Sequence, residues 1–328
     1  MTVEVFKFLR VIDETAAIEA GKQQGRFLAG GTNLVDLMKI GVESPSTIVD
    51  VSQVPLGKIE ELPDAIKIGA LVRNSDLAWH PLVERELPML AQALLSGASP
   101  QLRNLATTGG NLLQRTRCAY FRDVENPSCN KRRSGSGCAA MDGWTRMHAI
   151  LGGSPQCIAV NPSDMNIALA ALDATITVRG PNGVRQIAIA DFHTLPGDHP
   201  EIESTLRAGE LVTHVIVPKN RFAASSAYVK VRDRASYAFS VVSCAAGLEL
   251  EAGSIKTARL ALGGVATKPW RVTAAEALLV GQKPSVAAFA AAAEAALQGA
   301  QPRKDNAFKI ALAKRTIVRA LGIAGGAA

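Results

Sequence analysis

Four of the five cysteines lie in one stretch of the chain, and thiolates bind metals and take part in redox chemistry. They are Cys118, Cys129, Cys138 and Cys157, with ten, eight and eighteen residues between successive members. Structural zinc usually takes at least one closely spaced cysteine pair, which this spacing lacks, and two disulfides would need an oxidising compartment. Four unlinked core thiols are a third interpretation. A four-cysteine iron–sulfur cluster tolerates irregular spacing, because loops can wrap it from several directions. The spacing favours a cluster and leaves the other interpretations open.

The residues around these cysteines favour turns over helices or strands. The stretch from residue 115 to residue 163 has little hydrophobic periodicity and many glycines and prolines, which predicts a long irregular segment. Such a segment inside a compact domain is uncommon and is usually functional. Because it buries little apolar surface, a centre bound by four thiolates would hold it in place. The fifth cysteine, Cys244, lies in the apolar run 238–250 and is predicted to be a core residue.

Two glycine pairs upstream are candidates for binding the phosphates of a dinucleotide. Gly30 and Gly31 stand between a predicted strand, 26–29, and a predicted helix. Glycines allow close backbone approach, and the amides of a helix N-terminus suit a pyrophosphate. A second element, Thr-Gly-Gly-Asn at 108–111, directly precedes the cysteine stretch, which would place a cluster beside the cofactor. Neither element matches the Rossmann or P-loop pattern, so a different fold would hold the ligand. Two unrelated tight turns are the alternative.

Composition and charge limit the class of protein. A chain of 328 residues, 48% of them hydrophobic, predicts two domains, or one domain with a second lobe, around a large core. The net charge is +7, and seven Lys/Arg stand against three Asp/Glu between residues 115 and 146. A nucleic-acid patch is one interpretation, but aromatic residues are few there and no binding module is recognisable. Offsetting an anionic thiolate-bound cluster, or contacting a partner, explains the basic cluster better.

The chain shows no targeting or membrane segment. No apolar leader follows Met1, and no run approaches the length of a membrane-spanning helix. We therefore expect a soluble chain with no secretion signal of its own and no membrane insertion. It could still cross a membrane already folded, attached to a subunit that carries a signal.

Periodicity and turn residues predict an α/β-rich first part and a meander with helices after it. The expected strands of the first part are 3–10, 26–29, 47–51, 65–72, one ending at Val160, 175–180, 184–192 and 211–218. The expected helices there run from Asp13 to Gly25, from Thr32 or Asn33 onward, over 75–98 with interruptions at Pro81 and Pro88, and from Asp164 onward after a turn at 161–162. A hairpin turn is expected at 181–183 and a boundary near residue 222. Three antiparallel strands (227–234, 240–253, 254–265), two Ala-rich helices (272–299, 305–321) and a frayed tail (322–328) complete the chain.

The segments AGGTNL, TTGGN and GGVATKPWR, together with the four-cysteine insertion, resemble the FAD-binding medium subunit of molybdenum hydroxylases of the xanthine dehydrogenase type. The resemblance covers essentially the whole chain. It implies an α+β fold: a two-lobed FAD-binding domain of the vanillyl-alcohol-oxidase/PCMH type over 1–221, with the cysteine-rich insertion at 115–163, and a smaller lobe of a three-stranded antiparallel sheet with helices over 222–328. The insertion looks like that of a subgroup with an extra [4Fe–4S] cluster. LVRNSDLA and VRDRASYAF add a likeness to the FAD subunit of bacterial periplasmic-type aldehyde oxidoreductases, and 4-hydroxybenzoyl-CoA reductases compete.

The resemblance assigns residues to two cofactors and none to substrate catalysis. For FAD it implies the pyrophosphate loop Ala29, Gly30, Gly31, Thr32, Asn33 and Leu34, and a second loop of Thr108, Gly109, Gly110 and Asn111. Asp164 falls where the family contacts the adenosine part, Val212 where an aliphatic side chain packs near the cofactor, and Lys230 close to the isoalloxazine. Helix capping is the simpler role for Asp164, and an ordinary strand-end position is the simpler role for Lys230. The implied [4Fe–4S] ligands are Cys118, Cys129, Cys138 and Cys157.

The implied function is electron transfer within a heterotrimeric oxidoreductase. A large partner subunit would carry the molybdenum cofactor and a small one two [2Fe–2S] clusters, so the isolated chain is expected to be inactive on the aldehyde. FAD would pass electrons to an external acceptor, either a protein carrier, a quinone or oxygen. The expected location is the periplasm, by co-export with a signal-bearing partner, or otherwise the cytoplasm. A zinc- or disulfide-stapled basic binding module and a stand-alone flavin oxidase are the alternatives from other classes.

Overall fold

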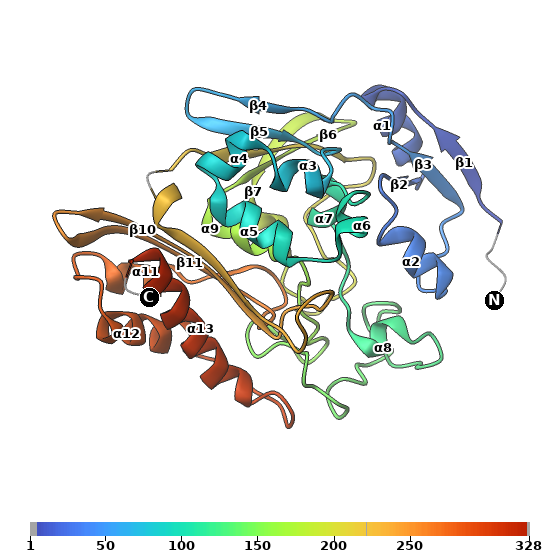
Figure 1. The fold of residues 1–328 in the computed structure, drawn as a ribbon. Helices are drawn as coiled ribbons and strands as arrows, with labels where there is room; N and C mark the ends of the chain where they lie inside the picture. The colour runs from blue at the N-terminus through green and yellow to red at the C-terminus, as the bar shows by residue number, and fades with distance from the viewer. Residues whose placement is uncertain (1–4, 221, 327–328) are drawn as a thin grey trace.

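The computed structural model describes residues 5–220 and 222–326, which form three sheets with helices around them (Figure 1). The first sheet is parallel, in the order β1-β3-β2, with strands β1 (Lys7–Arg10), β2 (Arg26–Leu28) and β3 (Thr47–Asp50). Its helices are α1 (Glu14–Lys22) and α2 (Leu34–Lys39). Asp13 caps α1, because its side chain accepts a hydrogen bond from the Ala16 amide (2.9 Å), as the sequence predicted. The helix ends at Lys22, three residues before the predicted stop.

The second sheet is antiparallel, in the order β4-β5-β8-β6-β7, and carries the larger hydrophobic core. Its strands are β4 (Ile59–Glu61), β5 (Ala65–Gly69), β6 (Thr175–Gly180), β7 (Gly183–Ala188) and β8 (Leu211–Pro218). The predicted hairpin at 181–183 joins β6 to β7, and Gly183 has the positive φ of +97° that such a tight turn requires. β4 lies in a turn-rich stretch where no strand was expected.

Several helices pack against this sheet or lie beside it. They are α3 (Asn74–Ala78), α4 (Pro81–Glu86), α5 (Pro88–Ser96), α6 (Pro100–Arg103), α7 (Thr108–Leu112), α9 (Asp164–Ala171) and α10 (Ile189–Phe192). The predicted interruptions at Pro81 and Pro88 are confirmed. Each proline begins a new helix, at the position where a missing amide hydrogen costs nothing.

The third sheet has the order β12-β11-β10-β9 and is covered by three helices (Figure 1). Its elements are η1 (Ala223–Ser225), β9 (Ser226–Val231), β10 (Val242–Glu251), β11 (Ser254–Gly263), β12 (Trp270–Arg271), α11 (Thr273–Leu279), α12 (Val286–Ala296) and α13 (Phe308–Ala324). The predicted meander is present, and Cys244 is fully buried on β10 as expected.

Three expectations for this part of the chain are wrong. The sheet has four strands rather than three, because Trp270 and Arg271 pair with β11. The expected helix over 272–299 is two helices, since the chain turns at Gly281 with a φ of +81°. The start of the tail expected to fray, 322–324, belongs to α13 instead, and residues 327–328 lie outside the described residues.

The segment between α7 and α9 is irregular, as predicted. Its one named helix is α8 (Ala119–Arg122). The strand expected to end at Val160 is wrong, because the backbone groups there bond to different segments rather than to one partner strand. The Ala149 amide donates to the Ile158 carbonyl (2.9 Å), and the Asn161 amide donates to the Ala266 carbonyl (3.1 Å). Among the described residues, no helix is long and apolar enough to span a membrane.

A buried lysine joins the C-terminal helix to the irregular segment. The Lys309 side chain on α13 is fully buried, and its Nζ donates to the carbonyls of His148 (2.9 Å) and Gly264 (2.7 Å). Burial, together with the positive charge of Arg146, lowers the pKa of Lys309 to about 7. The lysine therefore links three distant parts of the chain and releases its proton much more easily than a lysine in water.

We expect Lys309→Met to remove part of the pH dependence of stability. The folded chain releases this proton near pH 7, whereas the unfolded chain holds it to about pH 10.4. Between these values the unfolded state binds more protons, so Lys309 makes the free energy of unfolding rise with pH, by up to about 1.4 kcal/mol per unit. Urea unfolding across this pH range measures the rise. Lys314→Met, on the same helix, is the control, because the Lys314 side chain is 33% exposed and lies outside the buried contacts of Lys309. It should keep the wild-type slope, and a Lys309→Met slope equal to it would contradict this role of Lys309.

Candidate functional site

A cavity of about 800 Å³ lies between β2, α7 and the segment 193–212. Most of the residues predicted to bind FAD line it, namely Ala29, Gly30, Gly31, Thr32, Asn33, Leu34, Gly109, Gly110 and Val212. The two glycine pairs are eighty residues apart in the sequence, counted from Gly30 to Gly110, and the fold brings them to the same cavity.

Gly30 is required by a close backbone contact. A Cβ atom on Gly30 would lie 1.9 Å from the Leu105 carbonyl oxygen and 3.2 Å from the Ala106 Cα. The next residue, Gly31, has a φ of +71°, a left-handed conformation that favours glycine. The first glycine pair therefore packs directly against the chain that leads into the second.

The two glycine elements differ in how their amides are used. The amides of Gly30, Gly31 and Thr32 have no hydrogen-bond acceptor among the described residues, so they are available to an anion. In the second element, the Thr108 amide donates to the Val72 carbonyl (2.9 Å) and the Gly109 amide to the Ala70 carbonyl (2.8 Å). The second element is thus the first turn of α7 rather than an open loop. It lets a ligand approach closely but offers fewer amides than we expected.

Thr108 and Asn111 belong to the scaffold of the cavity rather than to its lining. The Thr108 hydroxyl donates to the Val72 carbonyl (3.0 Å), and the Asn111 amide nitrogen donates to the Asn74 side chain (2.8 Å). The Ser163 hydroxyl donates to the other end of the Asn111 side chain (2.8 Å), which ties α7 to the start of α9.

Asp164 and Lys230 pair with each other instead of facing the cavity. Their charged groups are 2.7 Å apart, with 8% and 4% of the side chains exposed. The Tyr228 hydroxyl also donates to Asp164 (2.7 Å), and Lys230 donates to the Ser96 carbonyl (3.0 Å). Neither Asp164 nor Lys230 is among the described residues that line the cavity. The pair joins α9 to β9, which is a structural role, and the contacts with adenosine and isoalloxazine stay predictions.

All four predicted cysteine ligands line one second, smaller cavity. All five cysteines of the chain are free of disulfides. Burial raises the pKa of Cys118 to about 12 and also raises the pKa of Cys138 and of Cys157. Within residues 5–220 and 222–326, no group of three or more Cys, His, Asp or Glu side chains is placed to hold a metal ion. The donor chemistry nevertheless fits a thiolate-bound cluster, because four soft sulfur donors surround one cavity.

The two cavities share part of their walls. Lys131, Cys157 and Ala159 line both of them. The two cavities are therefore adjacent, with Cys157 between them as part of the lining of both. The adjacency expected from the sequence, a cysteine site beside a dinucleotide site, is present.

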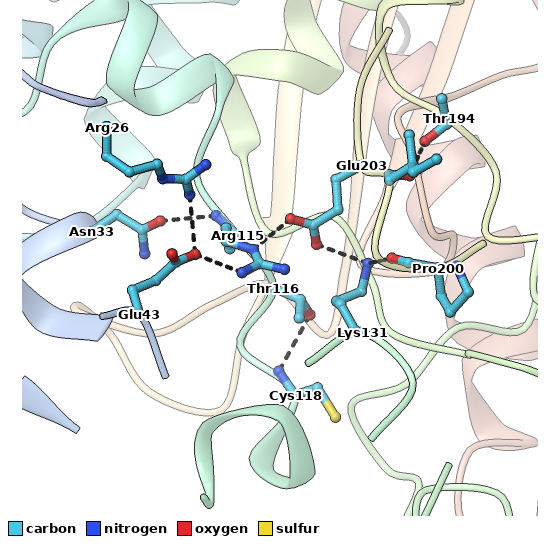
Figure 2. Close-up of polar contacts among 11 residues, drawn as sticks. Arg26, Asn33, Glu43, Arg115, Thr116, Cys118, Lys131, Thr194, Pro200 and Glu203 are labelled. Atoms are coloured by element: carbon cyan, nitrogen blue, oxygen red, sulfur yellow. Dashed lines mark hydrogen bonds and ion pairs between the residues drawn. The ribbon is translucent and has the colours of Figure 1, made fainter. Parts of the chain in front are cut away.

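A network of ion pairs fastens the cysteine-bearing segment to the larger cavity (Figure 2). The Arg115 guanidinium bonds to Glu43 (2.6 Å) and to Glu203 (2.7 Å), and the Arg115 amide donates to the Asn33 side chain (2.9 Å). Lys131 pairs with Glu203 (2.8 Å). Burial disfavours the charge on Arg115, but Glu203 and Glu43 outweigh it and raise the Arg115 pKa. The network thus keeps these side chains charged although they are partly buried.

The basic cluster seen in the sequence is largely paired with acidic residues. Besides Arg115 and Lys131, both Arg117 and Arg122 bond to Asp36 on α2, at 2.9 and 2.8 Å. Their first role is therefore to bind the segment to the rest of the protein. Sequence reasoning found the basic excess but missed Glu43 and Glu203, because neither lies in a motif. It also missed His193, which lines the larger cavity and whose pKa burial lowers to about 4.

We expect Arg115→Met to destabilise the protein by about 3 kcal/mol. The substitution leaves two partly buried carboxylates with one cation fewer, and breaking a buried pair typically costs about 3–5 kcal/mol. The lower value applies because Arg26 and Lys131 remain as partners of Glu43 and Glu203. Urea unfolding measures the change. Arg85→Met is the control, since the Arg85 side chain is 61% exposed and its loss should leave the free energy of unfolding almost unchanged. Equal effects of both substitutions would refute a structural role for Arg115.

Gly30→Ala is expected to abolish binding of FAD, the cofactor that the resemblance implies. The new methyl group would meet the Leu105 carbonyl, so the loop must shift at a cost of about 1–3 kcal/mol, and its free amides would move with it. Flavin absorbance of the purified protein measures the bound cofactor. Gly57→Ala is the control, because a Cβ there has no neighbour within 4 Å. Full flavin content in Gly30→Ala would show that this loop does not hold the cofactor.

Comparison with known families agrees with the arrangement of the larger cavity. The family described as the FAD binding domain in molybdopterin dehydrogenase matches residues 5–220, which include both glycine pairs. The family described as the CO dehydrogenase flavoprotein C-terminal domain matches residues 195–324, which include the third sheet.

Individual relatives extend this likeness over nearly the whole chain. The aldehyde oxidoreductase FAD-binding subunit PaoB of Escherichia coli K12 is 49% identical over 310 residues, which are 93% of each chain. The glyceraldehyde dehydrogenase medium chain of Sulfolobus acidocaldarius is 27% identical and covers 85% of this chain and 82% of its own length. Among solved structures, a carbon monoxide dehydrogenase chain of Hydrogenophaga pseudoflava superposes with a TM-score of 0.78 at 26% identity, covering 100% of this chain and 99% of the other.

The fold, the glycine-lined cavity and these likenesses agree with one another. Both family matches fall on flavoprotein domains, and together they span residues 5–324. The chain therefore belongs to the FAD-binding medium subunits of xanthine dehydrogenase-type molybdenum hydroxylases and is an oxidoreductase subunit.

Proposed function

We propose that this chain is the FAD- and [4Fe–4S]-carrying electron-transfer subunit of a heterotrimeric, molybdenum-dependent aldehyde oxidoreductase. The observation that carries the proposal is the common wall of the two cavities, formed by Lys131, Cys157 and Ala159. One cavity is lined by the FAD-binding glycines and the other by four cysteines. The 49% identity to an aldehyde oxidoreductase FAD-binding subunit supports the substrate class.

The chain's own residues bind and position the two groups. The free amides of Gly30, Gly31 and Thr32 are suited to the FAD diphosphate, and Val212, which lines the same cavity, offers an apolar contact. Cys118, Cys129, Cys138 and Cys157 would be the cluster ligands. Arg115 and Lys131 hold the segment between the two sites. When bound, FAD supplies the exchange between one- and two-electron transfer, and the cluster supplies one-electron transfer.

Substrate oxidation belongs to other subunits in this proposal. A large subunit with the molybdenum cofactor would oxidise the aldehyde, and a small subunit with two [2Fe–2S] clusters would pass electrons to this chain. The electrons would leave through FAD to a protein carrier, a quinone or oxygen. We also propose that the complex is exported to the periplasm through a signal on a partner subunit.

Iron and flavin analysis tests the proposal. The complex, co-expressed with its partners and purified anaerobically, should contain about four irons and one FAD assigned to this chain, with a [4Fe–4S] EPR signal after reduction. Cys138→Ser should lose that signal. Cys244→Ser should keep it, because Cys244 is buried on β10 among apolar residues.

Two results would change the proposal in different ways. Zinc, or no metal, on this chain in a complex that retains FAD would refute the cluster and reduce the cysteine segment to a structural element. A folded complex in which this chain holds neither FAD nor iron would refute its electron-transfer function.

A further inference from the structure

One imidazole stands against a cysteine of the smaller cavity. The Nε2 atom of His148 lies 3.2 Å from the Sγ atom of Cys118, and the His148 residue is 5% exposed. The histidine belongs to the irregular segment, thirty residues after this cysteine. No sequence motif singled it out.

The backbone on which this ring stands is held from several sides. The His148 amide donates to the Thr145 carbonyl (2.8 Å), while its carbonyl accepts from Lys309 (2.9 Å) and from Asn306 (3.3 Å). The Tyr120 ring, which lines the cysteine cavity, lies 6.0 Å from the imidazole between centroids. The imidazole is therefore fixed in place rather than free to turn toward solvent.

The partner of Nε2 decides which tautomer is present. The Nδ1 atom of His148 is buried and has no hydrogen-bond partner among the described residues, so it is unsatisfied whether or not it carries the proton. A proton on Nε2 has the Cys118 sulfur as its acceptor. When Cys118 binds iron it loses its thiol proton, so its sulfur can only accept.

We propose that His148 is a positioning residue that donates its Nε2–H to the Cys118 thiolate of the [4Fe–4S] cluster. The inference rests on the cluster proposed above. Hydrogen bonds to cluster sulfurs help to set the reduction potential, because the donor stabilises the extra negative charge of the reduced cluster. His148 thus raises the potential of the cluster that lies beside the FAD cavity.

Redox-poised EPR of the whole complex tests this role. His148→Leu replaces the hydrogen-bond donor with an apolar side chain that still fills space. It should shift the midpoint reduction potential of the cluster to a more negative value at unchanged iron content. His148→Gln places an amide donor near the former Nε2 and should restore the midpoint toward the wild-type value. His214→Leu, on β8 and outside both cavities, is the matched control and should leave the midpoint unchanged.

The outcomes separate failure of the His148 hydrogen bond from failure of the proposed cluster. An unchanged midpoint in His148→Leu overturns the hydrogen bond, whereas a wild-type complex with no [4Fe–4S] cluster on this chain overturns the cluster itself. If the His148→Leu complex lacks the [4Fe–4S] cluster, His148→Gln decides. Retention of the cluster at a wild-type midpoint supports the donor role, and loss of iron from both variants overturns it in favour of a ligand or packing role.

Discussion

The ion-pair network around Arg115 is the interaction on which the site depends. Glu43 lies 72 residues before Arg115 and Glu203 lies 88 residues after it, yet both bond to the same guanidinium. The cysteine-bearing segment has almost no secondary structure. Its Phe121 packs with Leu37 of α2 in a small apolar cluster, and its Ile150 and Leu151 join the core of the third sheet. Charge pairing therefore adds to apolar packing in anchoring the segment. Arg115 contributes to the charge pairing and also to the packing, since its Cζ atom lies 4.6 Å from the centroid of the Phe121 ring.

This anchoring explains why the two cavities are neighbours. The Arg115 amide bonds to Asn33 in the first glycine loop, while Lys131 lines both cavities and pairs with Glu203. A movement of the cysteine segment would therefore disturb the cofactor loop as well. Lys309 of α13 also donates a hydrogen bond to the His148 carbonyl, so the C-terminal helix is bonded to the cysteine-bearing segment. The proposed cluster and the flavin are thus parts of one structural unit.

Local sequence rules predicted what depends on local geometry. Capping and turn preferences predict the Asp13 cap, the helix interruptions at Pro81 and Pro88 and the hairpin turn at 181–183, and the structure confirms them. Features that depend on distant partners were missed or wrong. The pairing of Asp164 with Lys230 joins residues 66 apart, and the expected strand before Asn161 fails because no neighbouring strand receives it. The glycines and cysteines could be singled out because their chemistry is visible in the residues themselves, and the fold gathers them at two adjacent cavities.

The central claim is that FAD and a cysteine-bound cluster occupy adjoining cavities of this chain. X-ray diffraction from crystals of the anaerobically purified complex, recorded at the iron absorption edge, tests it most directly. The account predicts a compact iron peak among Cys118, Cys129, Cys138 and Cys157, with flavin density next to the Cys157 side and its diphosphate on the loop 29–34. Iron density absent from that cavity, or flavin bound away from the glycine loops, would contradict it.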